Sequence, residues 1–186
     1  EILDKGFVEA KNIVFSLAGS ESDGQLDGSV ISGAISLRGT NQSDTLIGND
    51  QSNVIFLHAD TNDGAGFGVD TVSAGGGDDS IRLEQTRYFP QWSQIFSDYD
   101  ADTNSYLVSG AIDGGAGNDE FVVSINERWF HAGGGYSNEV RWGLDLTQLS
   151  MSNLENLVFA NRYNYGLDHI MLTASQVASL GAIKGA

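Results

Sequence analysis

The sequence contains no cysteine and only one proline among its 186 residues. Disulfide bonds therefore cannot support the fold, and in a protein outside the cell bound metal ions can take over that role. Glycine is abundant, with 24 residues, and the near absence of proline indicates tight turns in folded chain rather than a disordered linker. With 40% hydrophobic residues there is enough chain for one sizeable core, so we expect a single domain over 1–186.

Basic residues are also scarce. Nine Lys and Arg stand against 25 Asp and Glu, which gives a formal net charge of −16 at pH 7. This charge disfavours nucleic acid and anionic membranes as partners, and acidic residues in turns attract cations. No run approaches the roughly 18 apolar residues of a membrane helix, so we expect no direct membrane insertion. The chain begins at Glu1 without a signal sequence, and we interpret it as a monomeric module of a longer protein.

A nine-residue pattern, G-G-x-G-x-D-x-U-x with U a large apolar residue, organises the centre of the chain. Its copies are GTNQSDTLI (39–47), GNDQSNVIF (48–56), AGFGVDTVS (65–73), AGGGDDSIR (74–82) and GGAGNDEFV (114–122), with a weak copy SYLVSGAID at 105–113. Six glycine-rich residues favour a tight turn, and x-U-x favours a short strand with one inward side chain. Two nonapeptides then form one coil of a stacked structure.

Stacked coils bring the turn carbonyls and the sixth-position carboxylates of neighbouring coils together. An oxygen-only cage of this kind suits Ca²⁺ better than Mg²⁺ or Zn²⁺. If the register holds through the insertions, Asp44 stacks on Asp70 and Asp79 stacks on Asp119. The predicted calcium ligands of the repeats are Asp44, Asp70, Asp79, Asp119, Asn53, Asn41, Asp50, Gly75, Gly77, Gly114 and Gly117.

These repeats resemble those of the RTX (repeats-in-toxin) proteins, which bacteria export by type I secretion. The copy from Gly114 to Val122 matches the pattern at every defined position, and the resemblance covers roughly residues 29–124. It implies an all-β fold, a calcium-stabilised parallel β-roll that binds several Ca²⁺ ions. Around the roll at 39–124 we expect N-terminal cap strands (1–38) and a C-terminal cap (125–186) with an aromatic loop and a short helix. The copies are degenerate, because Gln51 replaces a glycine and Asn53 replaces an aspartate.

Two inserts interrupt the roll, at 57–64 and 83–104. In the first, Asp60 and Asn62 form either an extra calcium loop or a plain solvated turn. The second ends in alternating carboxylates, at Asp98, Asp100 and Asp102. The sixth and twelfth positions of that loop do not fit an EF-hand, so we expect a calcium site of another geometry or none.

Aromatic residues and arginines are enriched in the second insert and in the stretch 126–142. They form either a satellite core over an open side of the roll or a ligand site beside calcium. The predicted ligand-binding residues are Tyr88, Trp92, Tyr99, Arg128, Trp129 and Tyr136.

Catalytic motifs are missing from the sequence. There is no serine nucleophile elbow, and the three histidines have no metal-ligand spacing, so we do not expect an enzyme. The resemblance and the inserts favour a calcium-dependent binding module of a large secreted RTX adhesin, which recognises a peptide or protein on a host or other cell surface. The alternatives are a structural or secretion-assisting roll or surface-layer segment, and a calcium-dependent carbohydrate-binding module. All of these functions are extracellular.

Overall fold

The computed structural model describes residues 13–17, 20, 22–57, 68–89, 99–100, 102–103, 105–129, 143–160 and 169–185, with backbone alone at 85–89, 99 and 125–129. In this part the chain consists mostly of strands in parallel sheets and contains one short helix. The predicted all-β parallel β-roll is therefore confirmed.

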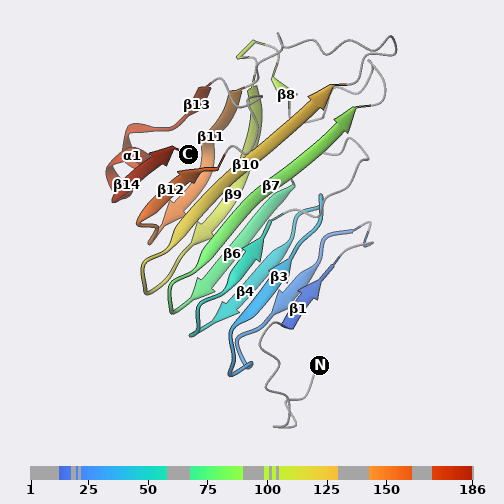
Figure 1. The fold of residues 1–186 in the computed structure, drawn as a ribbon, viewed down its shortest axis with the longest axis vertical. Coiled ribbons are helices and arrows are strands. Elements are labelled where there is room, and N and C mark those ends of the chain that lie inside the picture. Colours follow the sequence, from blue (N-terminus) through green and yellow to red (C-terminus); the bar gives the residue numbers. More distant parts are fainter. Residues whose placement is uncertain are drawn as a thin grey trace.

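Two sheets make up the roll (Figure 1). The first sheet contains, in spatial order, β1 (Ile13–Ser16), β3 (Ile35–Arg38), β5 (Val54–Phe56), β7 (Ser80–Phe89), β10 (Glu120–Trp129), β12 (Asn156–Phe159) and β14 (Ala182–Gly185). The second sheet contains β13 (His169–Met171), β11 (Gly143–Ser152), β9 (Ser105–Asp113), β6 (Val69–Gly75), β4 (Thr45–Asn49) and β2 (Gln25–Asp27). Outside this order, β8 (Tyr99–Asp100) pairs antiparallel with β9.

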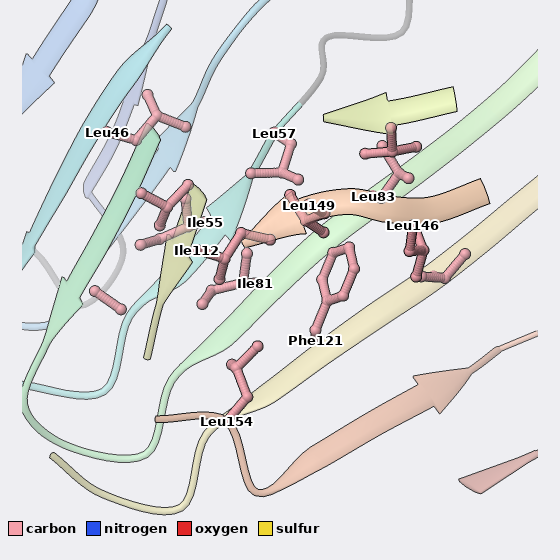
Figure 2. Packing of buried hydrophobic residues seen from close by; sticks show 14 of the residues in the cluster. Leu46, Ile55, Leu57, Ile81, Leu83, Ile112, Phe121, Leu146, Leu149 and Leu154 are labelled. Carbon is pink, nitrogen blue, oxygen red and sulfur yellow. The ribbon is translucent and has the colours of Figure 1, made fainter. Parts of the chain in front are cut away.

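The apolar column of the repeats forms the core between the sheets. In the first sheet, the register aligns Leu37, Ile55, Ile81, Phe121 and Leu157. In the second sheet, it aligns Leu26, Leu46, Val72 and Ile112. Figure 2 shows labelled members of both columns pointing into the space between the strands. Since most of these side chains are almost completely buried, their burial is the main stabilising contribution to each coil.

The two edges of the roll have different connections. At one edge, the chain passes from the second sheet to the first through short turns at 50–53, 76–79, 114–119 and 153–155, which we call the short-turn edge. At the other, the connections from first-sheet strands include the long segments 57–68, 90–104, 130–142 and 160–168, and we call it the long-connection edge. Figure 1 shows the short turns of successive coils lying side by side.

The sheets extend beyond the predicted roll in both directions. β1, β2 and β3 lie in the segment predicted as an N-terminal cap, and β12 to β14 lie in the predicted C-terminal cap. The predicted short helix is α1 (Ala174–Ser179), which begins at a capping box formed by Thr173 and Gln176. Gln176 Nε2 also donates to the carbonyls of Leu146 and Leu149, over 2.7 Å each, and so attaches α1 to β11. Among the described helical residues, none belongs to a helix that could span a membrane.

Candidate calcium site

The sixth-position side chains form a hydrogen-bonded ladder along the short-turn edge. The backbone N–H of Asn53 donates to Oδ1 of Asp79 over 2.7 Å, and the N–H of Asp79 donates to Oδ1 of Asp119 over 2.8 Å. The N–H of Asp119 donates to Oε2 of Glu155 over 2.7 Å. Each carboxylate therefore holds the coil that precedes it, which is the stacking predicted from the spacing of the repeats.

A second ladder uses the fifth positions and runs in the opposite direction. The N–H of Asp78 donates to Oγ of Ser52 over 3.1 Å, and the N–H of Asn118 donates to Oδ1 of Asp78 over 2.9 Å. In one turn, the N–H of Asp78 thus bonds to the preceding coil, and the N–H of the next residue, Asp79, bonds to the following coil. Because a buried N–H without a partner is costly, the first ladder explains the polar side chains at the sixth positions, whereas the bonds of the second ladder are exposed to solvent.

The remaining carboxylate oxygens of Asp79 and Asp119 have no such partner. Asp79 and Asp119 are at most 1% exposed, and neither Oδ2 atom has a hydrogen-bond donor. Loss of hydration raises the pKa of Asp79 to about 6 and also raises the pKa of Asp119. A buried carboxylate oxygen without a donor is neutralised either by a proton, which the raised pKa favours, or by a bound cation.

Backbone glycines allow the stacked turns to approach closely. Gly77 and Gly117 have φ values of 92° and 155°. A Cβ on Gly117 would collide with the carbonyl oxygen of Gly77, and one on Gly115 would collide with that of Gly75. This close stacking brings carbonyl oxygens of adjacent turns beside the two carboxylates, as the sequence pattern predicts.

The available donors are almost entirely oxygen atoms. Among the described residues, no three His, Cys, Asp or Glu side chains gather as a metal-ligand group, so a cation must also use backbone carbonyls. Carbonyl and carboxylate oxygens are the ligands that Ca²⁺ prefers. Asp79 and Asp119, each with a buried oxygen that has no donor, therefore fit calcium. The roles of Gly77, Gly114 and Gly117 as carbonyl ligands stay predictions, and the carbonyl of Gly75 already accepts the N–H of Ala116 over 2.9 Å.

The ladder at the long-connection edge is different. The N–H of Asp44 donates to Oδ1 of Asp70 over 3.0 Å, which is the predicted pairing. The carboxylate of Asp44 is already satisfied, because it accepts from Gly24 N–H (2.8 Å) and from the N–H (2.6 Å) and hydroxyl (2.9 Å) of Thr40. Burial raises the pKa of Asp70 to about 8. The roles of Asp44 and Asp70 as calcium ligands stay predictions. Because the carboxylate of Asp44 already has donors, the geometry favours Asp70 over Asp44 as a ligand.

Other predicted ligands lie apart from the short-turn ladder. Asp50 is exposed, and Asn41 Oδ1 accepts from Gln42 Nε2 over 3.3 Å. Asp100 and Asp102 are exposed, and Oδ1 of Asp100 accepts the N–H of Asp102 over 2.9 Å, an ordinary Asx turn. The predictions for Asp60, Asn62, Asp98, Trp92 and Tyr136 lie outside the described residues.

Glu155 was not predicted from the sequence, yet it completes the ladder. The turn at 153–155 is shorter than the turn at 114–119, and the longer glutamate side chain reaches Asp119 N–H across the difference. The signal in the sequence is its position two residues before Leu157, which lies in the apolar column. Without the glycine pattern before it, this spacing alone is not distinctive.

Four predicted ligand-binding residues lie on strands next to the long-connection edge. β7 and β10 pair over ten positions, which places the backbone of Tyr88 beside Arg128 and that of Phe89 beside Trp129. Tyr99 lies on β8, paired with Tyr106 of β9. The strand parts of the two aromatic stretches, at 85–89 and 125–129, are therefore adjacent in the fold.

Comparisons with known proteins agree with the repeat geometry. The family model of the RTX calcium-binding nonapeptide repeat (4 copies) matches residues 36–63 and 65–84, which contain the copies from 39 to 82. Comparison with curated proteins and with solved structures gave no match.

Proposed function

Since the chain belongs to the RTX calcium-binding repeat family, whose proteins are typically secreted, we propose that it is a calcium-dependent ligand-binding module of a large secreted adhesin. Its ligand is a peptide or protein on the surface of a host cell or another cell. Calcium binding follows from the repeats themselves, whereas the ligand is inferred from the inserts.

The observation that carries the proposal is the location of the long connections. All of them leave the carboxyl ends of first-sheet strands, so they belong to one edge of the roll. A roll that served only as a spacer has no use for the fifteen residues 90–104 between β7 and β9 or for the aromatic stretch 126–142. Loops gathered on one edge of a rigid scaffold are the usual arrangement of a binding site.

The two longest strands of the first sheet support the same conclusion. β7 and β10 extend past β5 and β12, which pair only with their first residues, and Figure 1 shows them projecting beyond their neighbours. Their far ends carry Tyr88, Arg128 and Trp129 in adjacent register. Aromatic rings and arginine dominate the binding energy of protein interfaces, and arginine pairs with carboxylates in two-pronged geometry.

Calcium is linked to this site through the strands. Asp79 and Asp119 immediately precede Ser80 and Glu120, the first residues of β7 and β10. A cation between these two turns therefore fixes the relative position of the two strands whose opposite ends carry the aromatic residues. The proposed binding is calcium-dependent for this reason, because the ligand site is assembled by the turns at the other edge.

A binding screen with a matched pair of variants tests the proposal. The chain is applied to peptide and glycan arrays in ~1 mM calcium and in chelator, a concentration at which extracellular calcium sites are filled. Peptide hits that chelator abolishes, and that Arg128→Ala weakens at least about tenfold, support the proposal. Arg38→Ala is the control, since it removes the same charge from β3 of the same sheet. Hits confined to glycans favour the carbohydrate-binding alternative, and two blank arrays favour the structural roll.

The absence of enzymatic activity is part of the same proposal. Asp79 and Asp119, two buried carboxylates at the short-turn edge, hold neighbouring coils through hydrogen bonds. We therefore assign these two carboxylates to coil stacking and calcium binding.

A further inference from the structure

Asn53 interrupts the column of sixth-position aspartates at the short-turn edge. Its side-chain nitrogen lies near four oxygen atoms: the carbonyls of Asn49 (3.1 Å), Gln51 (2.5 Å) and Ala74 (3.2 Å), and Oδ1 of Asp79 (3.1 Å). These oxygens come from two stacked turns, 48–53 and 74–79. The nitrogen therefore lies at the junction between two coils, surrounded by acceptors.

The nitrogen occupies the place of a carboxylate oxygen in the other coils. A Cβ built on Gly48 would lie 3.0 Å from Asn53 Nδ2, and one built on Gly114 would lie 2.9 Å from Asp119 Oδ2. Gly48 and Gly114 are the first residues of their repeats. At one junction the equivalent atom donates hydrogen bonds, whereas at the next junctions it is an acceptor without a partner; the other amide atom of Asn53, Oδ1, is also buried without a partner.

The difference decides which junction needs a cation. At the Asn53 junction the turn oxygens face an amide donor, and the sixth positions carry one carboxylate, that of Asp79. At the following junction they carry two, Asp79 and Asp119, each with an unpartnered Oδ2. Oδ1 of Asn53 has no donor in the observed orientation either, but reversing the amide would remove the hydrogen bonds of Nδ2 and place Oδ1 among four oxygens, which is unfavourable without a metal ion.

The coils on the N-terminal side are closed in a similar way. Asn49 Nδ2 donates to the carbonyls of Ile31 (2.7 Å) and Gly33 (2.8 Å), which lie in the turn of the preceding coil. At the long-connection edge, Asp44 accepts three hydrogen bonds from Gly24 and Thr40. Side-chain amides and hydroxyls of the chain thus satisfy oxygen atoms on both edges of these coils.

We propose that Asn53 takes the place of a calcium ion, so that the junction between turns 48–53 and 74–79 is closed by an amide. The coils containing β2 to β5 then remain folded without metal at the short-turn edge, and at that edge calcium is confined to the junctions formed by Asp79 and Asp119. The roll has a metal-independent part and a metal-dependent part, with the boundary at Asp79. This inference depends on calcium binding by the repeats and not on the identity of the ligand.

Counting calcium ions in a pair of variants tests the inference. After equilibrium dialysis of the full chain in ~1 mM calcium, Asn53→Asp binds one more ion per chain than the wild type, because it restores the second carboxylate. Ser52→Asp adds the same charge in the same turn, at a position where Asp78 stands in the next coil, and it leaves the ion count unchanged. An equal count for Asn53→Asp and wild type overturns the inference.

Hydrogen exchange on the wild type provides a second readout that requires no variant. In chelator, the amides of β4 and β5 stay protected while those of β7 and β10 lose protection. In calcium, all four strands are protected. Loss of protection in all four strands together on removal of calcium also overturns the inference, since it makes the whole roll a single metal-dependent unit.

Discussion

The backbone N–H of Asp79 donates to Oδ1 of Asp119 over 2.8 Å, although 40 residues separate the two in the sequence. The other oxygen of Asp119 is buried without a partner. One carboxylate thus has two functions: one oxygen holds the preceding coil, and the other faces the junction where a cation fits. A change at this position therefore affects both the stacking of coils and calcium binding.

Asp79 occupies the same position in the preceding coil, and replacing it by alanine separates the contribution of coil stacking from that of calcium binding. The variant loses the acceptor for the N–H and the amide of Asn53, and a buried donor without a partner costs about 1–3 kcal/mol. We expect the melting temperature to fall by at least about 4 °C in chelator and by more in calcium, because the bound ion is also lost. Thermal unfolding followed by circular dichroism measures both differences.

Asp27→Ala is the control for this experiment. Asp27 is exposed, and its carboxylate accepts from the hydroxyl of Ser29 and from the N–H of Ser29 (3.0 Å), both of which water can replace. Its melting temperature should match the wild type in both buffers. If Asp79→Ala lowers the melting temperature by the same amount with and without calcium, the carboxylate of Asp79 is not a calcium ligand.

Gly77 tests whether close stacking of the turns requires glycine. Its φ is 92°, and a Cβ there would come within 2.6 Å of the backbone of Gln51 and Ser52. We expect Gly77→Ala to lower the free energy of unfolding by about 2 kcal/mol or more, since both strain and overlap oppose it. In Gly33→Ala, the new methyl group meets nothing within 4 Å, so denaturant unfolding should show little loss. Equal losses in the two variants would argue against a stacking role for Gly77.

The repeat spacing predicted the central coils well, because apolar residues and aspartates recur every nine positions. It paired Asp44 with Asp70 and Asp79 with Asp119, as the structure does. It did not extend the roll to its ends, because the outer coils have strands without glycine-rich turns. β3 enters the first sheet through Leu37 and its backbone hydrogen bonds, neither of which requires the nonapeptide.

The calcium ligands were less predictable than the fold. A sequence pattern records which residues can bind a cation, but not which oxygens already have donors. The hydrogen bonds of Thr40 to Asp44 depend on the way that the turn folds, and so do the contacts of the Asn53 amide. Glu155 was missed for a similar reason, since its reach to Asp119 compensates for a shortened turn that only the structure reveals.

Gln176 is expected to fasten the C-terminal helix to the roll. It is buried, and its amide donates to the carbonyls of Leu146 and Leu149, on either side of the irregularity in β11. Gln176→Ala leaves both carbonyls without this donor, so we expect a loss of about 1–3 kcal/mol in denaturant unfolding. Val177→Ala, at a side chain that is 48% exposed, should change stability by less than about 0.5 kcal/mol. Unchanged stability of Gln176→Ala would assign the attachment of α1 to its apolar contacts.

The raised pKa values of Asp79 and Asp70 predict that calcium reverses the effect of pH on stability. Burial raises these pKa values to about 6 and about 8, so the folded chain without calcium binds protons more tightly than the unfolded chain. The contribution of these two groups to the free energy of unfolding is therefore highest below about pH 4 and is lost as the pH rises through the two values. Calcium binds the deprotonated carboxylates, so its affinity increases over the same range.

Thermal unfolding at about pH 5 and about pH 7.5, with and without chelator, measures both trends. In chelator the melting temperature should be lower at the higher pH, and the gain on adding calcium should be larger there. Asp79→Asn is the matched control: it cannot titrate at that position, so the part of the decline near pH 6 should shrink. A melting temperature in chelator that rises with pH would show that these carboxylates are already charged in the folded chain without calcium.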